Sequence, residues 1–71
     1  MTDFVKLADA LRADPQWGPV VRRYARSFRA GGAKMGEVAR AAAQEMAGKF
    51  RTPSSEVVQV VGLAIVREAM R

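Results

Sequence analysis

Apolar residues recur along this chain at the spacing of a helix, in segments separated by proline and glycine. In the first three segments they fall at positions i, i+3, i+4 and i+7, which places them on one helix face. The first segment ends at Asp14-Pro15 and the second at Gly31-Gly32. The fourth begins at Thr52-Pro53, with Thr52 as the helix cap and Pro53 at the first helical position. The pattern predicts an all-α fold, a compact bundle of four short helices over residues 3–13, 19–30, 34–49 and 54–70.

The fourth segment differs from the others because it is apolar on almost every side. Between Val57 and Val66 the only polar side chain is that of Gln59. A helix that is apolar all round must be covered all round, and three short helices can surround it only partly. The segment is therefore either a central core helix or the seam of a homodimer. We expect the homodimer, with an interface formed by Val57, Val60, Val61, Ala64 and Ile65.

The length of 71 residues corresponds to a single helical domain over residues 1–71. A domain this small buries a lower share of its surface than a larger one, so its stability is marginal. It contains no cysteine or histidine, so disulfides are impossible and the usual zinc ligands are missing. The first residues are not those of a secretory signal, and no segment has the length of a membrane span. We expect a cytoplasmic protein that does not associate with membranes.

The composition argues against catalysis. Histidine and cysteine, which supply the commonest general base and the strongest nucleophile, are absent. The seven acidic residues fall at predicted helix caps or on polar helix faces. The glycines of residues 31–36 lack the spacing of a phosphate-binding loop. We predict that the protein is not an enzyme and that it uses no cofactor, metal ion or small-molecule substrate.

Charge is the most informative feature, because it is concentrated in one part of a basic chain. The net charge is +5, and residues 15–34 carry five positive charges and no acid, while the rest of the chain is balanced. An arginine row without interleaved acids repels itself, so stability alone does not favour it. Arginine pairs well with phosphate, which favours a polyanion as ligand. A solvated basic face and an acidic protein partner remain as alternatives. The candidate contact residues are Arg22, Arg23, Arg26, Arg29 and Lys34, with the Gly31–Lys34 loop extending the contact.

Trp17 is the only tryptophan and lies in a turn between Pro15 and Pro19. A tryptophan in such a turn is most often a lid over the core. The alternative is an exposed anchor for an interaction partner.

Two short segments resemble parts of DNA-binding folds. Residues 35–43 resemble the first helix of a helix-turn-helix, although no glycine follows Ala43 where the turn would come. Ser54-Ser-Glu-Val-Val-Gln-Val-Val61 is similar to the second helix of ribbon-helix-helix repressors. In that family a DNA-reading strand precedes two helices, and here it would fall within residues 24–32, where helical spacing fits better. Each resemblance covers less than half of the chain, and neither assigns a family.

The sequence therefore predicts a small non-enzymatic regulator that binds DNA, or RNA, through the arginines of the second helix. A transcriptional role and a homodimer are expected. The alternative is a helical protein–protein interaction module, an adaptor or inhibitor of the kind that mobile elements encode, which docks its basic face on an acidic partner.

Overall fold

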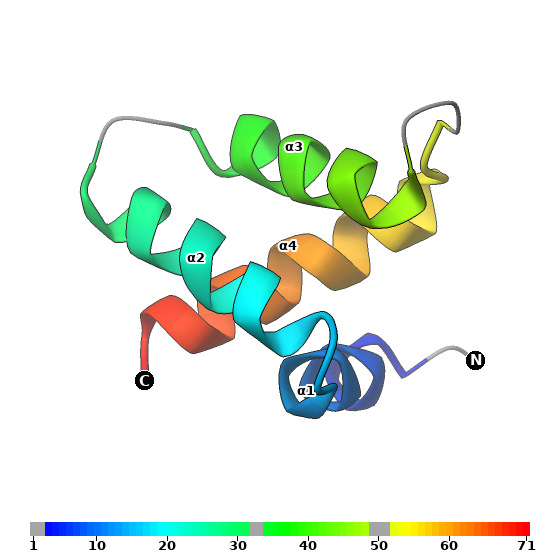
Figure 1. The fold of residues 1–71 in the computed structure, drawn as a ribbon, viewed down its shortest axis with the longest axis horizontal. Coiled ribbons are helices and arrows are strands. Elements are labelled where there is room, and N and C mark those ends of the chain that lie inside the picture. The colour runs from blue at the N-terminus through cyan, green and yellow to red at the C-terminus, as the bar shows by residue number, and fades with distance from the viewer. Residues whose placement is uncertain (1–2, 32–33, 49–51) are drawn as a thin grey trace.

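The computed structural model describes residues 3–31, 34–48 and 52–71, and within them it contains four helices and no strand. These are α1 (Phe4–Ala13), α2 (Gly18–Arg29), α3 (Met35–Ala47) and α4 (Ser55–Ala69). The predicted all-α bundle is confirmed. Figure 1 shows α4 crossing the middle of the molecule, with the other three helices packed around it.

Local sequence explains where the helices begin and end. The Asp3 carboxylate accepts a hydrogen bond from the backbone N–H of Lys6 at 3.0 Å and caps α1. The cap of α4 was predicted at Thr52, but it is Ser54, whose hydroxyl accepts from the N–H of Val57 at 3.2 Å. α3 ends at Ala47, short of the predicted residue 49, because Gly48 adopts the left-handed region with φ 94°. Residue 49 lies outside the described residues.

The middle of α4 lies in the core of the single chain, where part of the interface predicted for a dimer is already buried. Val61 is 2% exposed, and Ala64 and Ile65 are 0% exposed. Three of the five predicted interface residues are thus already covered by helices of their own chain, because all three other helices pack on α4. Of the two that remain, Val57 is 42% exposed and Val60 is half-buried. The interpretation as a central core helix is confirmed.

Small residues let α3 lie close against α4. Ala39, Ala42 and Ala43 are buried on the inner face of α3. A Cβ atom added at Gly62 of α4 would lie only 3.2 Å from the Cβ of Ala39, so the two helix backbones approach closely there. Close approach brings many atoms into van der Waals contact, which compensates for the small size of the side chains.

Neither local resemblance extends to the fold. α3 runs without a break through Ala43 to Ala47, so the turn of a helix-turn-helix is missing. The stretch that would be the strand of a ribbon-helix-helix protein lies in α2, and residues 24–29 are helical.

Candidate nucleic-acid interface

The start of α2 fixes which face of this helix is turned outward. Gly18 is buried, and a Cβ atom added to it would lie 2.7 Å from the carbonyl oxygen of Arg12 at the end of α1. Only glycine allows α2 to begin so close to α1. Val21 and Ala25 then enter the core at 0% and 3% exposure, flanked by the half-buried Phe28. The remaining flank of the helix must face solvent.

Three arginines occupy this outward flank, at positions i, i+4 and i+7 of the same helix. We call them the arginine row: Arg22, Arg26 and Arg29. All three are exposed, and no hydrogen bond or ion pair joins their side chains to any described residue. Their guanidinium groups are therefore available to an external anion.

Arg23, which was predicted as a further contact residue, lies beside the row and has a partner within the chain. Its guanidinium group forms an ion pair with both carboxylate oxygens of Glu45 on α3 and lies over the ring of Tyr24, 5.2 Å from the centroid. The Tyr24 hydroxyl donates to the same carboxylate at 3.1 Å. Arg23 thus links α2 to α3 through Glu45. Burial raises the pKa of Tyr24, and the neighbouring Glu45 raises it further.

Lys34 is exposed and stands at the N-cap of α3, with an extended backbone at φ −76° and ψ 146°. No described residue pairs with its ammonium group. Gly31, at the end of the preceding turn, adopts φ 85°. Gly32, in the middle of the predicted Gly31–Lys34 contact, lies outside the described residues.

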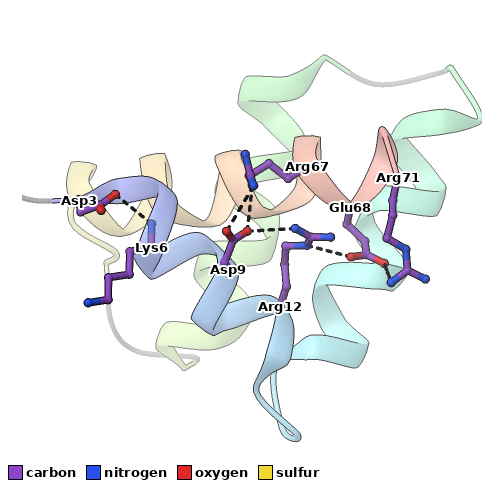
Figure 2. A network of polar contacts seen from close by, with 7 residues as sticks. All are labelled: Asp3, Lys6, Asp9, Arg12, Arg67, Glu68 and Arg71. Carbon is purple, nitrogen blue, oxygen red and sulfur yellow. Dashed lines mark hydrogen bonds and ion pairs between the residues drawn. The ribbon is translucent and has the colours of Figure 1, made fainter.

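A second set of arginines forms ion pairs that join α1 to α4 (Figure 2). Asp9 of α1 accepts from Arg67 of α4 at 2.9 Å and from Arg12 at 3.0 Å. Arg12 also donates to Glu68 of α4 at 3.0 Å, and Arg71 lies 3.7 Å from the same carboxylate. The hydrogen bond from Arg67, followed by the contribution of Arg12, lowers the pKa of Asp9. Sequence analysis missed this network because its partners are 56 and 58 residues apart in the chain.

The arginines that the structure describes therefore differ in their surroundings. Arg12, Arg23, Arg67 and Arg71 each have a carboxylate partner. The arginine row has none among the described residues, although α2 is the helix with the greatest density of positive charge. Arg40 is also exposed and without a described partner, but it belongs to α3. On a helix that advances about 100° per residue, Arg40 lies roughly 140° away from Glu45, which faces α2.

The fold and this surface define a small all-α bundle in which the described part of α2 carries a basic flank without carboxylate partners. Comparison of the chain with protein-family models, with curated proteins and with solved structures found no match. Among the described residues, no group of three or more histidine, cysteine, aspartate or glutamate side chains is placed to hold a metal ion. In the same residues, no helix combines the length and apolar character needed to cross a bilayer.

Proposed function

We propose that this chain is a small non-enzymatic regulator that binds nucleic acid, DNA foremost, through the arginine row. The observation that carries the proposal is a contrast among the described residues: four other arginines pair with carboxylates, whereas the three arginines of the row are exposed and have no partner there. Arginines that repel one another along a helix gain stability when a polyanion approaches. Each guanidinium group can then pair with a phosphate in a bidentate fashion.

The spacing of the row suits a phosphate backbone. Arg29 is seven positions after Arg22, which corresponds to a helix rise of about 10.5 Å. If α2 lies along the duplex axis, this length spans about three base-pair steps with a rise of about 3.4 Å each. Contacts of this kind provide affinity and register but no choice of sequence. The proposed transcriptional role therefore needs either DNA shape or a further contact for specificity, and it does not need the homodimer expected from the sequence.

Fluorescence anisotropy of a labelled generic duplex, measured across a series of salt concentrations, tests the proposal. Three arginine–phosphate contacts predict a slope of about −2.7 in a plot of log K against log salt concentration. Arg26→Ala should weaken binding to all duplexes alike and reduce the magnitude of the slope by about one. Arg40→Ala is the matched control, because it removes an exposed and unpaired arginine from another helix.

Two outcomes would contradict the proposal. Equal losses for Arg26→Ala and Arg40→Ala would mean that the duplex responds to net charge and not to the arginine row. No binding at low salt would mean that the row does not bind nucleic acid. In that case an acidic protein surface becomes the better candidate ligand for the arginine row.

A further inference from the structure

An apolar groove lies beside the N-terminal half of α4, and no residue of the arginine row lines it. It has a volume of about 470 Å³. Its lining includes Leu7, Leu11, Trp17, Met46, Val57 and Val60. Leu7 is 48% exposed and Val57 is 42% exposed, so this is an open groove and not an enclosed cavity. Trp17 is half-buried in its wall, and Val57 and Val60 are the two predicted interface residues that the fold leaves accessible.

The groove exists because three short helices do not cover α4 completely. α1 and α3 each pack on α4, but in the described parts of the chain they do not pack on each other. The groove occupies the space between them, with α4 as its floor and Met46 at the end of α3 on one side. The ion pairs that join Asp9 and Arg12 to Arg67 and Glu68 hold α1 in place, so the groove is preformed.

The charge of the groove is opposite to that of the molecule. Asp14 and Glu56 are the charged residues of the lining, in a chain whose net charge is +5. The Asp14 carboxylate accepts from the N–H groups of Gln16 and Trp17 at 2.8 and 2.9 Å, which fixes its position. Glu56 is exposed and has no described partner. A nucleic acid is repelled here, and a second copy would place carboxylate against carboxylate at the same groove.

We infer that this groove binds an amphipathic helix of another protein, with apolar side chains in the groove and Lys or Arg beside Glu56 and Asp14. A helix in an apolar groove uses anchors at i, i+3 or i+4, and i+7, which suits a trough between two helices. A small-molecule site has several polar groups that converge on the ligand. This groove has only two charged groups in its lining, and one of them, Asp14, already accepts hydrogen bonds from the turn after α1. The inference does not depend on the proposed binding of nucleic acid, since the two sites share no residue.

The test is a selection of peptides from a displayed random library of helix length against the full chain, without any assumed natural partner. We expect the selected peptides to share an apolar stripe at helical spacing and an excess of Lys or Arg. Leu7→Gln should weaken their binding about tenfold, because it replaces a central apolar contact. Val5→Gln is the matched control, since Val5 is on the same helix and 45% exposed but does not line the groove.

The charge of the groove is tested separately with Glu56→Gln. This variant should weaken binding of the basic peptides about two- to threefold at low salt, with the difference lost at high salt. Arg26→Ala should leave peptide binding unchanged, which separates this site from the arginine row. All four substitutions are at exposed positions, so folding is retained and is checked by circular dichroism.

The inference is overturned if no peptide is selected, if the selected peptides are acidic, or if Leu7→Gln and Val5→Gln have the same effect. It is also overturned if the protein forms a dimer in sedimentation equilibrium that Leu7→Gln abolishes. That result would make a second copy of this chain the occupant of the groove.

Discussion

The most direct test of the fold is Ile65→Ala, which distinguishes a core helix from a dimer seam. Ile65 is 0% exposed within the single chain and is one of its largest fully buried side chains. The substitution removes three carbon atoms, whose transfer from water contributes about 2.4 kcal/mol at ~0.8 kcal/mol each. The cavity left behind raises the expected loss to about 3–4 kcal/mol. A chain of 71 residues has a free energy of unfolding of about 4–11 kcal/mol, so the variant loses a large share of its stability.

The measurement is urea unfolding followed by Trp17 fluorescence and by circular dichroism, at two protein concentrations. Val57→Ala is the control on the same helix, and because Val57 is 42% exposed its loss should stay below about 1 kcal/mol. The midpoints should not depend on protein concentration, since the core is complete within one chain. Similar losses for the two variants would refute the assignment of α4 as a core helix, and a midpoint that rises with protein concentration would show that a second copy adds to the stability.

Two further predictions concern the packing of α2 and its link to α3. Gly18→Ala should lower the free energy of unfolding by about 1–3 kcal/mol, because the new Cβ would lie 2.7 Å from the Arg12 carbonyl oxygen. Gly36→Ala, whose Cβ meets no atom within 4 Å, should instead add about 0.5 kcal/mol in the same urea assay; the opposite order would contradict the packing. Tyr24 is the only tyrosine, so its absorbance titration should give a pKa above the ordinary value of 10.0, moving back toward it in Glu45→Gln. Because the pKa of Tyr24 is raised in the folded state, the environment of its neutral hydroxyl stabilises the fold below about pH 10, and this stabilisation is lost as the pH rises through the folded pKa. A Tyr24 titration midpoint at or below 10.0 would contradict the raised pKa.

The helices could be predicted from the sequence because their signals are local. The apolar stripe at i, i+3, i+4 and i+7 belongs to one helix, and proline and glycine mark its ends within a few residues. The error at the start of α4 has the same origin. Thr52 and Ser54 are both good caps, and only the hydrogen bond from the Val57 N–H to the Ser54 hydroxyl decides between them.

The division of the arginines could not be predicted from the sequence, because it depends on helices that are distant in the chain. Arg22 and Arg23 are neighbours in sequence, yet Arg23 pairs with a glutamate 22 residues away and Arg22 has no described partner. The ambiguity of α4 is of the same kind. Val61 and Ile65 are removed from water equally well by helices of the same chain or by a second copy, and hydrophobic patterning does not distinguish these two sources of cover.

The two proposed surfaces can operate in one small molecule because their ligands respond differently to salt. The molecule measures 30 × 26 × 23 Å, while charges in water are screened over about 8 Å at physiological ionic strength. Each surface is therefore governed mainly by its nearest charges, which are arginines on α2 and the carboxylates Asp14 and Glu56 at the groove. DNA is held by its contacts with the arginine row, which are electrostatic and weaken with salt. A basic helix in the groove is attracted by these two carboxylates and repelled by the net charge of +5, and salt screens both effects. Its apolar contacts with the groove persist at high salt. A salt concentration that releases DNA from the arginine row should therefore leave a helix bound in the groove.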